Sequence, residues 1–392
     1  MAAAAPTTPE VARDAATPGI IATNRLEFLD GIRGVAAALV VVHHLPTFVA
    51  APAFVAAMSL GNPWVAIFIT LSGFCLYLPA AKRERVEMPR PFWEFMSRRA
   101  RRIVPPWYAS LVFCTLIGLG LRTVSYRFAD AFVPQNGWDV LTHLTLTHSL
   151  TRYAGSINGP GYTLGTEWQL YLMMFGFVWL ARKFGWLPLI GTVAVLTAFP
   201  FPGMAGNLVQ KLLNPTFTVP FLLGMAGARL ARRPFPFAGR FSPANEPALF
   251  ALIAVSSLAG YLILNPHSHE IACWLAGLAT ASGCVFMARR PRSLVARAFG
   301  SRAGRTLGSF SYSLYLTHLP LLGLIAAFSG ADALSGAAPA SAFYTRFVPA
   351  LPLVFGFAYV FYLLFERPFL NAPRSKAQTA APLPILHGQP SK

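Results

Sequence analysis

The chain has 392 residues, of which 55% are hydrophobic and only 12% are charged, and its mean hydropathy is +0.52. This composition is too apolar for an average soluble domain, and several runs approach the roughly 20 apolar residues that a membrane-crossing helix needs. The formal charge of +18 indicates either a nucleic-acid partner or a membrane protein, and its distribution along the chain has to decide between them.

We predict an all-α, polytopic membrane protein with about ten transmembrane helices. The expected spans are residues 35–49, 64–78, 107–121, 164–180, 186–199, 215–230, 248–264, 271–288, 307–328 and 347–365. The third span is expected to start directly after Pro105 and Pro106, since proline is tolerated in the first turn of a helix. Residues 122–163 are expected to form a long polar loop. A membrane domain at residues 25–370 is then flanked by polar tails, 1–24 and 371–392, that we expect to be disordered.

The basic residues alternate with these spans. Ten spans put both termini on one side of the membrane, and that side then carries 27 of the 32 Lys and Arg residues. The excess of Lys and Arg in cytoplasmic loops predicts that both termini are cytoplasmic. The positive charge is therefore a signal of topology in the cytoplasmic membrane, and it requires no nucleic-acid partner.

The polar residues suggest neither a disulfide framework nor a metal centre. The four cysteines fall in or beside apolar runs and show no CxxC or Cys/His ligand spacing. His267, His269 and Glu270 form a short HxHE turn, which surface polarity explains better than metal binding. We expect no metal.

Ionisable residues inside the predicted spans are candidates for function, because burying them in lipid is costly. At about 1.5 Å per helical residue, His44 lies roughly 16 Å beyond Arg33, close to the bilayer midplane. His318 lies at a similar depth in the ninth span, and Glu167 is the only carboxylate in the fourth. Three roles stay open for this set: the proton relay of a transporter or flippase, the acid–base groups of an enzyme, or structural hydrogen bonds between helices.

A second candidate group is the arginine cluster before the third span. Arg98, Arg99, Arg101 and Arg102 occupy five residues and would cover two adjacent faces of a helix. Guanidinium groups bind phosphate oxygens bidentately, so the cluster fits a nucleotide-like ligand. It also fits a stop-transfer anchor on anionic lipid.

Six phrases in chain order resemble the acyltransferase-3 family of integral membrane O-acyltransferases. They are LDGIRGVAAALVVVHH (29–44), FITLSGFCL (68–76), FMSRRARRIVPPWY (95–108), GYTLGTEWQLYLM (161–173), SFSYSLYLTHLP (309–320) and FERPF (365–369). Arg33 and His44 match the family's Arg-x10-His element, and Glu167 matches its glutamate. His43 stands where the family usually has an aromatic residue, and Trp168 where it often has a second acidic one.

The resemblance implies transfer of an acyl group, often acetyl, from acyl-CoA to a hydroxyl of a sugar, glycan, glycolipid or polyketide. In that case acyl-CoA is the donor and no metal is needed. We expect Arg33, Arg98, Arg99, Arg101 and Arg102 to bind the donor. His44 is expected to act as general base, with Glu167 and His318 as further catalytic residues. Arg33 has a second possible role, holding the first helix against Glu366. A covalent acyl-histidine stays open, as do Ser72, Tyr312 and His318 as oxyanion donors.

Overall fold

The computed structural model describes residues 26–53, 55, 63–198, 210–233, 245–264, 269–331 and 337–370, and most of these residues are helical. The long helices are α1 (Glu27–Phe48), α3 (Pro63–Tyr77), α4 (Phe92–Thr123), α6 (Tyr162–Phe184), α7 (Trp186–Ala198), α9 (Pro215–Arg232), α10 (Glu246–Leu264), α11 (His269–Arg289), α14 (Ser311–Ala327) and α16 (Val348–Phe361). The only extended pairing in the described ranges is an isolated bridge between Val49 and Ala338. The predicted tails and His267 lie outside these ranges.

All ten segments predicted as spans are helical, and a subset meets a strict criterion for crossing a bilayer. By length and apolar composition, α1, α4, α11 and the helical stretch 340–370 could each cross alone. A fifth span forms if α13 (Arg302–Ser309) and α14, which meet at 62°, are counted together. Helices α3, α7 and α10 are apolar but shorter. The all-helical, membrane-type fold is therefore confirmed, whereas the number of spans and the side of the termini stay predictions.

Two boundaries differ from the prediction. Helix α4 starts at Phe92, not after Pro106, so that the arginine cluster is helical and both Pro105 and Pro106 lie inside the helix. Arg and Met are good helix formers, which favours a helix before the prolines. The helix continues through the pair although an interior proline removes a backbone hydrogen bond and crowds the carbonyl of the preceding turn. The predicted polar loop at 122–163 is built from short helical turns: η1 (Ala129–Phe132), α5 (Gly137–Leu144), η2 (His148–Leu150) and η3 (Gly159–Gly161).

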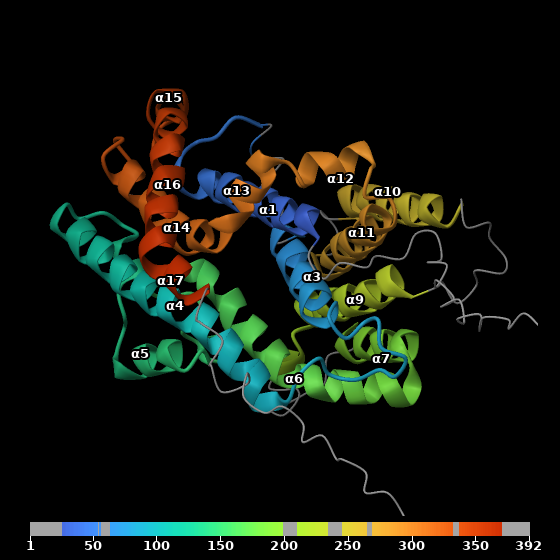
Figure 1. The fold of residues 1–392 in the computed structure, drawn as a ribbon. Helices are drawn as coiled ribbons and strands as arrows, with labels where there is room; N and C mark the ends of the chain where they lie inside the picture. The colour runs from blue at the N-terminus through green and yellow to red at the C-terminus, as the bar shows by residue number, and fades with distance from the viewer. Residues whose placement is uncertain are drawn as a thin grey trace, which may run out of the picture.

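Helices α1 and α3 run through the middle of the molecule, with α14 and α16 (348–361) on one side and α9 to α11 on the other (Figure 1). Helix α3 packs on α9 and α11, while α1 packs on α13 and α14. Large apolar side chains stay exposed on the outer faces of α4 and α10, among them Leu116 and Val255. Such faces suit lipid contact, because lipid tails are as apolar as the side chains.

The start of α1 is held against α13 by glycine. A Cβ added to Gly308 would lie 2.0 Å from the carbonyl oxygen of Asp30, and one added to Gly34 would lie 2.7 Å from the backbone nitrogen of Gly308. The two backbones can touch only because neither residue has a side chain. This close approach fixes the turn of α1 that carries Arg33.

Candidate functional site

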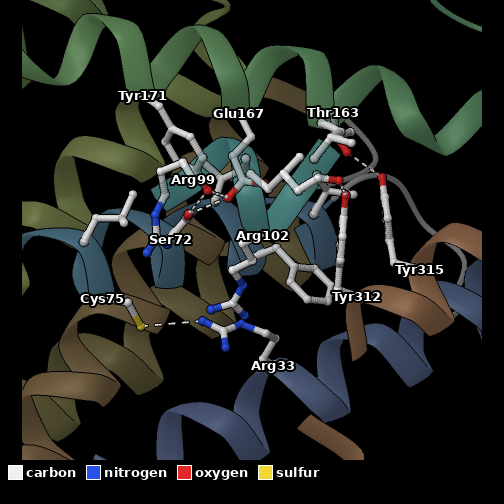
Figure 2. A pocket seen from close by; sticks show the side chains of 16 residues that line it. Arg33, Ser72, Cys75, Arg99, Arg102, Thr163, Glu167, Tyr171, Tyr312 and Tyr315 are labelled. Atoms are coloured by element: carbon white, nitrogen blue, oxygen red, sulfur yellow. Dashed lines mark hydrogen bonds between the residues drawn. The ribbon is translucent and has the colours of Figure 1, made fainter. Parts of the chain in front are cut away.

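An arginine-lined cavity lies where α1, α3, α4, α6 and α14 meet (Figure 2). Its volume is about 130 Å³. Arg33, Arg99 and Arg102 line it together with one carboxylate, Glu167. Three guanidinium groups against one carboxylate leave the cavity positively charged, so it suits an anionic ligand.

The turn of α4 divides the arginine cluster in two. Arg99 and Arg102 are three residues apart, share one face of the helix and line the cavity. Arg98 and Arg101 are exposed on the other face, where Arg98 pairs with Glu94 of the preceding turn at 3.1 Å. The cluster thus covers two adjacent faces, and only one of them borders the cavity.

Arg33 enters the cavity from α1 and is fixed by two neighbours. One of its guanidinium nitrogens lies 3.6 Å from Sγ of Cys75 and the other 3.6 Å from a carboxylate oxygen of Asp30. Glu366 is buried nearby and accepts a hydrogen bond from the Ser313 hydroxyl at 2.7 Å. Among the described residues Arg33 therefore forms its ion pair within α1, not with Glu366.

Glu167 is the centre of a hydroxyl network on the opposite wall of the cavity (Figure 2). It accepts hydrogen bonds from the Ser72 hydroxyl at 2.5 Å and from the Tyr171 hydroxyl, and these two hydroxyls lie 2.9 Å apart. Tyr312, also in the lining, donates to the backbone carbonyl of Ile103 at 3.2 Å. Ser72 and Tyr312 thus already donate their protons within the protein.

His44 and His318 meet at the crossing of α1 and α14. Nε2 of His318 lies 3.2 Å from Nδ1 of His44, and the ring centroids are 5.0 Å apart. His318 is fully buried, whereas His44 is partly accessible. The two histidines predicted at equal depth are therefore in direct contact.

The accessible side of His44 borders a second cavity of about 310 Å³. Three phenylalanines and a tyrosine contribute to its lining, which includes Phe48, Phe128, Phe132 and Tyr162. This cavity shares no lining residue with the arginine-lined cavity. His44 is thus on one side of a partition, and Arg33, Arg99, Arg102 and Glu167 are on the other.

Tyr315 forms part of this partition. It lines the arginine-lined cavity, and its hydroxyl donates to the carbonyl of Pro160 at 2.5 Å and lies 2.5 Å from the hydroxyl of Thr163. Pro160 lines the His44 cavity. Hence one tyrosine touches the walls of both cavities, and its ring lies 5.9 Å from that of His318.

Residues 122–163, several of which line the His44 cavity, are held in place by a stack of rings. His143 and His148 lie 4.3 Å apart and nearly parallel, and Trp107 of α4 stacks against both. Nε2–H of His148 donates to the Gly161 carbonyl at 2.9 Å. Burial, with a smaller contribution from His143, lowers the pKa of His148 to about 4. This imidazole is therefore neutral at physiological pH and serves packing.

Comparison with known proteins identifies the family. A family model described as an acyltransferase domain, that of the acyltransferase-3 family, matches residues 26–364. The chain belongs to the acyltransferase-3 family. Together with its apolar helices, this membership makes it a multi-pass membrane acyltransferase. No curated protein and no solved structure gives a significant match.

The matched acyltransferase domain contains both cavities, and they divide the predicted site residues between them. Arg33, Arg99, Arg102 and Glu167 line one cavity, and His44, with His318 behind it, borders the other. Arg98 and Arg101 line neither.

Two residues that line the arginine-lined cavity were not predicted from the sequence, Tyr171 and Cys75. Tyr171 lies one helical turn from Glu167, and Cys75 lies one helical turn from Ser72. Within the described ranges no group of three or more His, Cys, Asp or Glu side chains is arranged to hold a metal.

Proposed function

We propose that this acyltransferase moves an acyl group, acetyl in the simplest case, from acyl-CoA to a hydroxyl of a sugar, glycan, glycolipid or polyketide acceptor. In this proposal it acts in the cytoplasmic membrane, with His44 as general base. One observation carries the proposal: a cavity with three guanidinium groups lies on one side of a partition, and a histidine bordering a second cavity lies on the other.

The arginine-lined cavity suits the donor. Coenzyme A carries several phosphate charges, and forked guanidinium groups bind phosphate oxygens in pairs. The cavity volume of about 130 Å³ is below the usual range for small-molecule sites, about 300–1,000 Å³, so it holds only part of the donor. We assign it the diphosphate of the donor, with the pantetheine arm and its acyl end directed to Tyr315 and the adenosine outside.

The His44 cavity suits the acceptor. Its volume of about 310 Å³ lies within the usual range for small ligands, and its aromatic walls offer flat apolar faces. A sugar ring or a polyketide presents such a face together with hydroxyl groups. An acceptor hydroxyl in this cavity is within reach of the imidazole of His44.

The chemistry needs one proton acceptor and one leaving group. His44 takes the proton of the acceptor hydroxyl while its oxygen attacks the thioester carbonyl. The C–S bond then breaks, and the thiolate of CoA leaves and is protonated by the imidazolium of His44. The products are an ester and free CoA, and His44 is neutral again.

The partition sets a requirement for this step. Because Tyr315 and Thr163 lie between the cavities, the thioester carbonyl has to reach the acceptor past the hydrogen bond from Tyr315 to Pro160. Glu167, through its hydrogen bonds to Ser72 and Tyr171, orients the polar wall on the donor side. The transfer therefore links a donor on one side of the partition formed by Tyr315 and Thr163 to an acceptor on the other side, where His44 lies.

The test is release of free CoA by the purified protein in lipid nanodiscs, supplied with acetyl-CoA and a glycan or polyketide acceptor. We expect acceptor-dependent release, reduced about 10²–10⁴-fold in His44→Ala, the usual contribution of a general base. His269→Ala, at an exposed position at the start of α11, is the control and should retain activity. Full turnover by His44→Ala would remove His44 from catalysis. Substrate flux driven by a pH gradient without CoA release would instead favour a proton-coupled transporter.

A further inference from the structure

His318 is surrounded by acceptors in a way that fixes its proton. Its Nδ1 lies 2.8 Å from the carbonyl oxygen of Tyr315 and 3.1 Å from that of Leu314. A carbonyl oxygen only accepts hydrogen bonds, so Nδ1 of His318 must carry the hydrogen. In a neutral ring the other nitrogen, Nε2, then carries no hydrogen and presents a lone pair. That lone pair faces His44.

The same argument places the hydrogen of His44 on Nδ1. Its Nδ1 lies 2.8 Å from the carbonyl oxygen of Val40 and 3.2 Å from Nε2 of His318. Both neighbours are acceptors, so Nδ1 of His44 carries its hydrogen and shares it between them. The opposite assignment would set lone pairs against the carbonyls of Val40, Leu314 and Tyr315. A single proton arrangement of two neutral rings thus satisfies all the contacts.

We propose that His318 is a positioning residue for His44: it accepts a hydrogen bond from Nδ1–H of His44 and so keeps Nε2 of His44 as a lone pair on the side of the acceptor cavity. This inference rests on the proposed function, in which His44 is the general base. It also assigns His318 a role other than base or oxyanion donor, since its Nδ1–H is committed to the backbone and its Nε2 carries no hydrogen.

The arrangement suits the catalytic cycle as well as the resting state. When His44 takes a proton on Nε2, both of its nitrogens carry hydrogen, and Nδ1–H still points at the lone pair of His318. The hydrogen bond then joins an imidazolium to a neutral acceptor, which is stronger than the bond between neutral rings. His318 therefore stabilises the charged form of His44 without itself gaining or losing a proton, the role that the third member of a catalytic triad has.

The first test reads the protons directly and needs no substrate. The wild-type protein, labelled with ¹⁵N in its histidines, is studied by NMR in nanodiscs near pH 8, and His44→Gln and His318→Gln spectra assign the two rings. We expect both rings in the Nδ1–H form and a ¹⁵N–¹⁵N coupling across the hydrogen bond between them. A His318 ring with its hydrogen on Nε2 would overturn the proposal.

The second test is functional and uses three replacements of one residue. His318→Leu removes the acceptor, and we expect kcat to fall about 10²-fold or more while KM for acyl-CoA stays within about twofold, because the donor cavity is separate. His318→Gln and His318→Glu both restore an acceptor oxygen and should recover part of kcat. An oxyanion donor would give the opposite result for glutamate, which has no hydrogen to donate, so that His318→Glu would be no better than leucine.

The two tests separate the inference from the proposed function. If the NMR spectra show the predicted proton arrangement but no acceptor releases CoA, the positioning of His44 stands and the acyltransfer assignment fails. If CoA is released but the three variants have equal kcat, the acyltransfer assignment stands and the role of His318 is overturned. Thermal melts of each variant in nanodiscs establish that a loss of kcat is not a loss of folding.

Discussion

Arg99 and Arg102 differ from Arg98 and Arg101 in one respect, the face of α4 on which they lie. We predict that Arg99→Gln or Arg102→Gln raises KM for acyl-CoA about tenfold or more. A hydrogen bond to a charged group contributes about 1.5–3 kcal/mol, and about 1.4 kcal/mol corresponds to a factor of ten. Steady-state kinetics with acetyl-CoA in nanodiscs measures the effect.

The neighbouring pair provides a matched control. Arg98→Gln and Arg101→Gln remove the same charge from the same helix, but on the exposed face. We expect their KM to stay near the wild-type value. An equal rise in all four variants would mean that the cluster attracts the donor only by its overall charge, and no change in any of them would leave lipid anchoring as its role.

For single residues, the sequence predicts the depth of a side chain in the membrane better than it predicts which other side chains it contacts. The rise of a helix places His44 and His318 equally deep, and the structure brings them within 3.2 Å. The depth of a residue does not say which helices are in contact. The same calculation therefore could not show that Glu167 lines one cavity while His44 borders the other. The partition by Tyr315 depends on contacts between residues about 150 positions apart, which no local pattern records.

Among the elements, the crossing of α1 and α13 makes the sharpest stability prediction. Gly308→Ala places a Cβ about 2.0 Å from the Asp30 carbonyl, so the two helices must separate. We expect a loss of about 1–3 kcal/mol in stability, the usual cost of overpacking, and a lower kcat/KM because Arg33 moves with α1. Thermal unfolding in nanodiscs measures the first effect.

Gly120→Ala is the control for this change. Gly120 lies near the end of α4, and a Cβ there meets nothing within 4 Å. Alanine favours the helix by up to about 1 kcal/mol relative to glycine, so this variant should be as stable as the wild type or slightly more stable. Equal destabilisation by both variants would contradict the tight-crossing explanation.

The ring stack in the segment between α4 and α6 predicts a response to acid. His148 has a pKa of about 4 in the folded protein, against an ordinary value of 6.5, because it is buried. Between these values the unfolded chain binds more protons than the folded one, so stability falls as the pH drops from 6.5 towards 4. The loss from this residue reaches about 3 kcal/mol. Above pH 6.5 the residue makes no pH-dependent contribution.

His148→Gln tests that response. Glutamine can still donate to the Gly161 carbonyl but does not titrate, so the unfolding temperature of the variant should depend less on pH between about 7 and 4.5. Melting curves of both proteins across this range give the comparison. Parallel curves for the variant and the wild type would assign the acid response to other residues.

The sequence predicted which segments are helical more completely than it predicted where the helices begin and end. Each predicted span is helical because long apolar runs in a membrane protein have no other satisfactory backbone arrangement. The start of α4 was misplaced because the prolines suggested a helix start, while the arginines before them continue the helix. The turns within residues 122–163 could not be predicted, because buried contacts such as Trp107 with His143 stabilise them.

On the scale of the whole molecule, the charge distribution predicts the topology. With 27 of 32 Lys and Arg on one side, residues 82–102 should face the cytoplasm and residues 122–163 the opposite side. In intact cells, a membrane-impermeant maleimide should label Trp138→Cys directly and Lys82→Cys only after permeabilisation. Both positions are exposed. Unmodified protein is the control, since three native cysteines are buried and Cys75 is partly so.

Reversed labelling of the two variants would invert the predicted orientation, and labelling of both in intact cells would contradict the number of spans between them. Either result would also move the arginine-lined cavity away from the cytoplasmic supply of acyl-CoA, so this experiment bears on the donor as well as on the topology.

The separation of the two cavities has a consequence for the cell that contains this enzyme. In the proposed transfer with the predicted topology, the acyl group passes from one face of the bilayer to the other as part of a bond being exchanged, with no water column joining the two compartments. Protons and sodium ions then gain no conductive route, and the electrical insulation of the membrane is preserved during turnover. Cells expressing the protein should keep their membrane potential when donor and acceptor are both abundant.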